Sequence, residues 1–132
     1  MENIKLINLN VNNYYTKPLK QPLFINNDLA WFIGLVYFKG VKDNSYIFIE
    51  NSKKKYLDKI SNILYLNFGF KNICHINIMN NNKKHIIIIS KFLNDWLIMN
   101  KLIKSCENED LPILIRKNSD EIIDSFLYSK SS

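Results

Sequence analysis

Apolar residues recur along this chain at two spacings, one typical of amphipathic helices and one typical of half-buried strands. Over residues 53–66 they lie three and four positions apart, which predicts a helix with one buried face. Over residues 73–79 polar and apolar residues alternate, which predicts a strand with one face on the core. In that strand the residues expected inward are Cys74, Ile76 and Ile78, and those expected outward are His75 and Asn77.

Capping residues set the ends of the predicted elements. Helix starts are indicated by Asn27 with Asp28, by Asn51 or Ser52, by Ser90 and by Ser119, and helix ends by Gly40 and Gly69. The predicted helices cover residues 29–37, 53–66, 91–104 and 119–129. The predicted strands cover residues 4–11, 45–50, 73–79 and 85–89.

Residues 1–25 are predicted to form an N-terminal extended arm, and residues 26–132 a single domain. The domain is expected to be of the α+β class, with an antiparallel sheet packed by helices. The arm contains Pro18 and Pro22, which interrupt regular structure. The arm is equally well explained as a segment that contacts a partner and as a tail that packs on its own domain. Its candidate contact residues are Tyr14, Tyr15, Lys17 and Lys20.

The formal net charge of +6 indicates a polyanionic partner, because a basic surface attracts one. The charge is carried by lysine, with Arg116 as the one arginine. Asn, Ile, Lys, Phe and Tyr dominate, which is also what an AT-rich genome would encode. Codon bias is therefore a second explanation of the charge. The two cysteines, Cys74 and Cys106, have no metal-ligand spacing, and no metal site or cofactor is expected.

The segment Trp31-Phe32-Ile33-Gly34-Leu35-Val36-Tyr37-Phe38-Lys39-Gly40 resembles the signature helix of LAGLIDADG homing endonucleases, often written W-F-I-G-F-V-D-G-E-G. The apolar frame and both glycines are present. Tyr37 and Lys39 stand at the two acid positions of the motif. Nucleases of this family cut DNA with divalent metal ions, which need oxygen ligands, and an ammonium at Lys39 would repel a cation. The resemblance therefore implies a relative without nuclease activity.

The motif helix carries a face of small residues, with Ala30 and Gly34 four positions apart. Family members use this face, with Gly40 at the helix end, to pack two signature helices together. The chain holds one copy of the motif, so we expect a helix from a partner at this face. Packing against the protein's own core is the alternative.

The resemblance implies a sheet that lies along nucleic acid, but with a shortened first hairpin. About a dozen residues separate Gly40 from Lys53, which leaves room for one good strand and a stub. A shortened sheet weakens the recognition of bases in a DNA groove. Lysine contacts to phosphate depend more on charge than on an exact geometry, so they are still expected. The candidate nucleic-acid-binding residues are Lys17, Lys20, Lys53, Lys54, Lys55, His75, Lys83, Lys84 and Arg116. Solvated turns are the other interpretation of the lysine runs.

Four functions are compatible with these patterns. The first is an inactive, domesticated relative that acts as a structural RNA-binding part of an organellar ribonucleoprotein, most concretely the mitochondrial ribosome. The others are an intron maturase, an active homodimeric nuclease with Asp43 or Glu50 as replacement acids, and a subunit of an organellar protein complex without nucleic-acid contact. We expect a mitochondrial protein, because the composition fits an AT-rich organellar genome. We expect it to be encoded in the organelle, because residues 1–9 lack a signal or transit pattern. No membrane insertion is expected.

Overall fold

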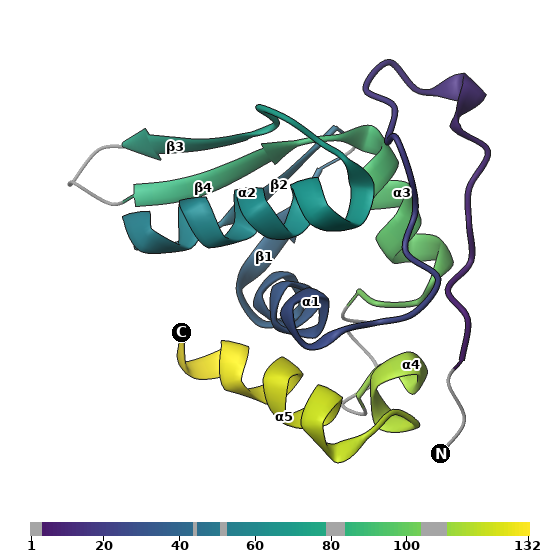
Figure 1. Ribbon diagram of the computed structural model, residues 1–132. Helices are drawn as coiled ribbons and strands as arrows, with labels where there is room; N and C mark the ends of the chain where they lie inside the picture. Colours follow the sequence, from purple (N-terminus) through teal and green to yellow (C-terminus); the bar gives the residue numbers. More distant parts are fainter. Residues whose placement is uncertain (1–3, 44, 51–52, 79–83, 104–110) are drawn as a thin grey trace.

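The computed structural model is an α+β fold in which a four-stranded antiparallel sheet packs on helices (Figure 1), so the predicted class is confirmed. It describes residues 4–43, 45–50, 53–78, 84–103 and 111–132. The strand order is β1-β2-β4-β3, so two hairpins meet through β2 and β4. The elements are α1 (Asn27–Lys39), β1 (Gly40–Lys42), β2 (Tyr46–Ile49), α2 (Lys54–Phe68), β3 (Cys74–Ile78), β4 (Lys84–Ile89), α3 (Lys91–Met99), α4 (Ile113–Arg116) and α5 (Asp120–Tyr128).

Helix α1 is the central helix of the molecule. It lies between α2, which packs against the sheet, and α5, which covers its other side (Figure 1). All residues from Leu29 to Tyr37 are buried, as expected for a helix that is apolar on every face. The cap is Asn26, whose Oδ1 accepts the Leu29 N–H at 2.8 Å, and not the predicted Asn27.

Helix α2 ends where the sequence predicts. Gly69 adopts a left-handed backbone with φ 74°, and its N–H donates to the Tyr65 carbonyl at 2.8 Å. The start differs from the prediction, because Lys53 occupies the cap position and makes no side-chain capping hydrogen bond. The predicted caps, Asn51 and Ser52, lie outside the described residues.

Helix α3 begins at the predicted cap but ends five residues early. Ser90 Oγ accepts the Leu93 N–H at 3.0 Å. At the other end Lys101 has a left-handed φ of 55°, and the Leu102 N–H donates to the Leu97 carbonyl at 2.9 Å. This is the hydrogen-bond pattern that terminates helices at a left-handed residue, here a lysine where glycine is usual. The sequence therefore gave no stop signal at this point.

The strands agree with the prediction except at the N-terminus. β2, β3 and β4 lie within one residue of their predicted ends, and β1 pairs with β2 over three residues as a short first hairpin. The predicted strand over residues 4–11 is wrong. Leu6 N–H donates to the Leu23 carbonyl at 2.8 Å, and Leu9 is held by the Gln21 side chain, so no regular ladder forms.

The N-terminal segment packs on the protein's own domain. Leu6 is buried, and Asn100 clamps Ile7 from both sides, because Asn100 Oδ1 accepts the Ile7 N–H at 2.7 Å while Nδ2 donates to the Ile7 carbonyl at 3.2 Å. The arm therefore contacts its own domain over this stretch, whereas the candidate contact residues Tyr15, Lys17 and Lys20 are exposed.

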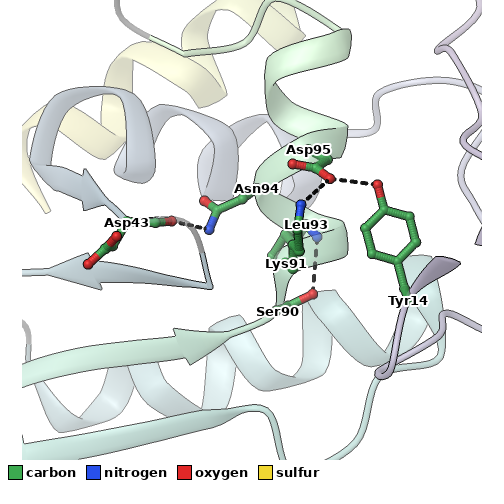
Figure 2. A network of polar contacts seen from close by, with 7 residues as sticks. All are labelled: Tyr14, Asp43, Ser90, Lys91, Leu93, Asn94 and Asp95. Carbon is green, nitrogen blue, oxygen red and sulfur yellow. Dashed lines mark hydrogen bonds and ion pairs between the residues drawn. The ribbon is translucent and has the colours of Figure 1, made fainter.

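A polar network around α3 joins the arm and the first hairpin to the core (Figure 2). Tyr14 hydroxyl donates to Asp95 Oδ2 at 2.6 Å, and Lys91 Nζ lies 3.2 Å from the same oxygen. On the other side of the helix, Asn94 Nδ2 donates to the Asp43 carbonyl at 2.6 Å. Two segments far apart in the sequence are thereby held on one short helix.

The C-terminal part contains the predicted last helix, α5, and an unpredicted single turn, α4. Ser119 Oγ accepts the Ile122 N–H at 3.3 Å, so the predicted cap is confirmed. The chain continues after α5 into a short 3-10 turn, Ser129–Ser131, which packs with α5 against α1. Helix α1 therefore packs against the C-terminal elements on one side and against α2 and the sheet on the other.

Candidate nucleic-acid interface

Tyr37 and Lys39, which the resemblance aligns with the two acid positions of the motif, lie at the C-terminal end of α1. Tyr37 is buried, and its ring lies 5.1 Å from Phe38 and 5.3 Å from Phe126. Lys39 is the last residue of the helix and is partly exposed. Tyr37 thus acts as a core residue that joins α1 to α5. Among the described residues, no three His, Cys, Asp or Glu side chains gather closely enough to hold a metal ion.

The small-residue face of α1 is occupied by the protein's own α5, which corrects the expectation of a partner helix there. Ala30 is fully buried. A Cβ added at Gly34 would collide with Ser129 Oγ and the Phe126 carbonyl oxygen. The close helix approach that the sequence indicates is therefore real, but both helices belong to the same chain. Gly40 is tight for a local reason, because its added Cβ would lie 2.5 Å from the Val36 carbonyl oxygen.

Lysines gather where α2 begins. We call Lys53, Lys54, Lys55 and Lys59 the lysine cluster. The first turn of α2 contains no acid, and Asp58 is the one acid among residues 53–59. Positive charge at the N-terminal end of a helix opposes the helix dipole, so this arrangement costs stability in the isolated chain. An anion bound there would remove that cost.

Two aromatic rings underlie the lysine cluster. Lys59 Nζ lies 3.9 Å from the centre of the Trp31 ring, and Lys55 Nζ lies 5.3 Å from the centre of Tyr56. The two rings are 5.4 Å apart, and Trp31 Nε1 donates to Ser132 Oγ at 3.2 Å. Cation–π contacts of this kind hold the ammonium groups over the rings and leave their remaining donors to solvent.

Sequence reasoning missed Lys59 and both rings. Lys55 and Lys59 are four positions apart, so the helical period was a signal that they share a face. No sequence signal joined Trp31 of α1 to α2, because that contact is tertiary.

The other predicted basic residues fall into two groups. Lys84 opens β4, and Figure 1 shows that the start of β4 lies at the same end of the molecule as the start of α2. Lys83 lies outside the described residues. Lys17 and Lys20 are on the arm near the far end of α2, where the Lys20 N–H donates to the Phe68 carbonyl at 3.3 Å. Arg116 is on α4. The predicted residues therefore do not form one surface.

The face of the sheet turned away from α1 and α2 is largely apolar. We call it the open sheet face. One cross-strand row runs from Val41 through Phe48 and Ile87 to His75. Its other members are Tyr46, Asn77, His85 and Ile89. Val41 and Ile89 are about half exposed, at 54% and 49%.

Two polar side chains of the open sheet face, Tyr46 and His85, contact neighbouring residues. The Asp43 carboxylate accepts a hydrogen bond from the Tyr46 hydroxyl. This hydrogen bond, the negative charge of Asp43 and the desolvation of Tyr46 raise the pKa of the Tyr46 hydroxyl. The His85 ring stands edge-on to Phe48 with their centres 6.4 Å apart. None of the outward strand residues is a lysine or arginine, so phosphate contacts on this face would depend on its margins.

Acidic side chains collect along α5 and at the start of α1, and two of them, Asp28 and Asp124, line the same pocket as Lys59 and Trp31. Asp28, Asp120, Glu121 and Asp124 are all exposed on α1 and α5. Asn27 Nδ2 donates to Glu121 Oε1 at 2.7 Å, which ties the starts of the two helices together. The net positive charge is thus uneven, with a basic end at the start of α2 and an acidic side along α5.

No family model and no curated protein matches this chain. In the part of the chain that the structure describes, none of the helices combines the length and the apolar character needed to cross a bilayer.

Proposed function

We propose that this chain is an inactive, domesticated relative of the LAGLIDADG homing endonucleases that serves as a structural RNA-binding component of a mitochondrial ribonucleoprotein, most concretely the ribosome. The lysine cluster at the start of α2 carries the proposal. Three of its ammonium groups, those of Lys53, Lys54 and Lys55, stand at the positive end of a 15-residue helix, where they destabilise the free chain. A phosphate backbone beside them would turn this cost into attraction.

The loss of nuclease chemistry is supported by the motif helix. Tyr37 packs against Phe126 in the core, and Lys39 places an ammonium at the helix end. Neither side chain offers a carboxylate to a metal ion. The short first hairpin, with β1 of three residues and β2 of four, also offers little surface for base reading in a groove.

Co-sedimentation tests the proposal. The native protein should travel with ribosomal particles from its organelle at low salt and leave them as salt rises, because phosphate contacts release counterions. A variant with the lysine cluster replaced by glutamine should leave the particles at lower salt than the native protein. Sedimentation with a membrane complex, unaffected by ribonuclease, would contradict the proposal.

A second candidate function is a subunit of an organellar protein complex without nucleic-acid contact. The observation that favours it is the open sheet face, where Val41, Phe48 and Ile87 form an uncharged apolar row. Under this alternative, replacing the lysine cluster would leave incorporation into the complex unchanged. Replacing Phe48 with serine would instead abolish it.

A further inference from the structure

The free edge of β3 differs from the other edge of the sheet. β1, at the opposite edge, has three residues and ends in Lys42, and a short, charged edge resists pairing with other chains. β3 has five residues, Cys74–Ile78, and contains no charged residue, no proline and no bulge. An edge without such protection is a template for a further strand.

The hydrogen-bond pattern of β3 shows which groups face outward. The Ile89 N–H donates to the Ile73 carbonyl at 2.8 Å, so in the antiparallel register His75 and Asn77 are the residues bonded to β4. The backbone N–H and carbonyl groups of Cys74 and Ile76 therefore point to the free edge. These groups fit the main chain of an extended polypeptide.

A groove of about 380 Å³ lies at the start of this edge, between α2 and residues 70–74. Ser61 and Leu64 of α2 line one wall, and Phe70 and Cys74 line the other. Lys71 also lines the groove, with its Nζ 5.9 Å from the centre of the Tyr65 ring. The groove therefore has both polar and apolar lining residues, which can receive alternate side chains of an added strand. It also has one ammonium group, that of Lys71.

We propose that β3 is a docking edge for an extended, acidic segment of a partner protein, which adds a fifth strand to the sheet. The main chain of the segment bonds to Cys74 and Ile76, alternate side chains enter the groove beside α2, and a carboxylate meets Lys71. The net charge of +6 disfavours a second copy of this chain as the occupant and favours an acidic segment. This docking is independent of the lysine cluster and of the proposed RNA binding.

The test uses a designed peptide and the full chain. The probe is a seven-residue peptide of alternating threonine and valine that ends in glutamate. At saturating peptide, amide hydrogen exchange at Cys74 and Ile76 should slow by about 10-fold, because both N–H groups gain acceptors. The matched control is the same peptide with N-methyl groups on alternate residues, which keeps the side chains and removes the donors. It should give no protection.

Two variations identify the contacts. A peptide that ends in lysine should bind more weakly than the one that ends in glutamate, because Lys71 would repel it. Ile76→Pro removes an edge-facing N–H without removing a bond to β4, and should abolish binding. If that variant fails to fold, the N-methylated peptide still decides the question.

Three results would overturn the proposal: unchanged exchange at Cys74 and Ile76, equal protection by the N-methylated peptide, or stronger binding of the lysine peptide. Protection that grows with the concentration of the chain alone would identify a second copy as the occupant and would also overturn it.

Discussion

At the scale of single residues, a few side chains hold together segments that are far apart in the sequence. Gly34 lets α5 approach α1, Asn100 clamps Ile7, and Asp95 receives Tyr14. Each contact is specific in shape or in hydrogen bonding, so conservative substitutions are informative.

Gly34→Ala should lower the free energy of unfolding by about 1–3 kcal/mol, because the added Cβ meets Ser129 Oγ and the Phe126 carbonyl and forces α5 outward. Thermal or urea unfolding measures the loss. The matched double variant with Ser129→Ala should recover part of the loss, since one of the two colliding atoms is gone. An unchanged melting temperature for Gly34→Ala would contradict the packing between α1 and α5.

Tyr14→Phe should lower the free energy of unfolding by about 1 kcal/mol near neutral pH, because it removes the hydrogen bond to Asp95. Burial, with the Asp95 hydrogen bond and charge, raises the pKa of Tyr14 from 10.0 to about 12. The protonated phenol is therefore favoured in the fold, and its contribution is complete below pH 10 and lost as pH rises toward 12.

The difference in unfolding free energy between the native chain and Tyr14→Phe should accordingly shrink above pH 10. Tyr15→Phe is the control, because Tyr15 is fully exposed. A difference that stays constant from pH 8 to 12 would contradict the role of the hydroxyl–carboxylate bond.

At the scale of elements, the ends of the helices carry the unusual features. α2 begins with lysines and without a side-chain cap, and α3 ends on a lysine with left-handed backbone. Both ends depart from the residue preferences of isolated helices. Substitutions at these two helix ends should therefore raise the free energy of unfolding of the isolated chain.

Lys101→Gly should raise the free energy of unfolding by about 0.5 kcal/mol, because glycine adopts a φ of 55° without steric strain. Asn72→Gly is the matched control. Asn72 also has a positive φ, 59°, but asparagine tolerates this region, so the gain should be smaller. Equal or greater stabilisation by Asn72→Gly would argue against strain at Lys101.

Replacing Lys53, Lys54 and Lys55 with glutamine should have opposite effects on stability and on RNA binding. The isolated chain should become more stable by about 0.3–1 kcal/mol, because positive charge leaves the helix N-terminus. Affinity for single-stranded RNA should fall, and the dependence of log affinity on log salt should flatten by about 2 for three lost phosphate contacts.

The matched control for the lysine substitutions is the triple variant Lys5→Gln, Lys101→Gln and Lys117→Gln, which removes the same charge from exposed positions elsewhere. It should keep most of the salt dependence. Equal losses of affinity in the two triple variants would mean that net charge, and not the lysine cluster, drives binding.

At the scale of the whole molecule, charge is unevenly distributed around a core that is built on α1. The lysine cluster lies where α2 begins, and acidic side chains line α5, with Asp124 of α5 and Lys59 of α2 in the same pocket. Helix α1 occupies the centre of the fold as a packing element. A nuclease of the LAGLIDADG family would need carboxylates at the end of this helix, where this chain has Tyr37 and Lys39.

The purified protein should leave double-stranded DNA uncut in the presence of magnesium or manganese, because Tyr37 and Lys39 supply no carboxylate ligand. Gel electrophoresis after long incubation measures this, with an active nuclease as the positive control for the DNA. Specific double-strand breaks that disappear in Asp43→Asn or Glu50→Gln would contradict the expectation.

The sequence alone determined the class of the fold and most element boundaries, because these depend on local physics. Alternation marked β3, three-and-four spacing marked α2, and side-chain caps marked the starts of α3 and α5. It also located the small-residue face of α1 and the lysines that open α2. The period of apolar residues and the capping residues are local properties of the sequence, so they can be recognised without knowing the tertiary structure.

Which distant segments contact each other became visible in the folded structure alone. It assigned α5 to the Gly34 face, folded the arm back onto Asn100, and brought Trp31 under Lys59. It also separated Lys17 and Lys20 from the lysine cluster by the length of α2, about 22 Å at 1.5 Å per residue. These pairings join residues distant in sequence, and periodicity along the chain carries no information about which surfaces come together.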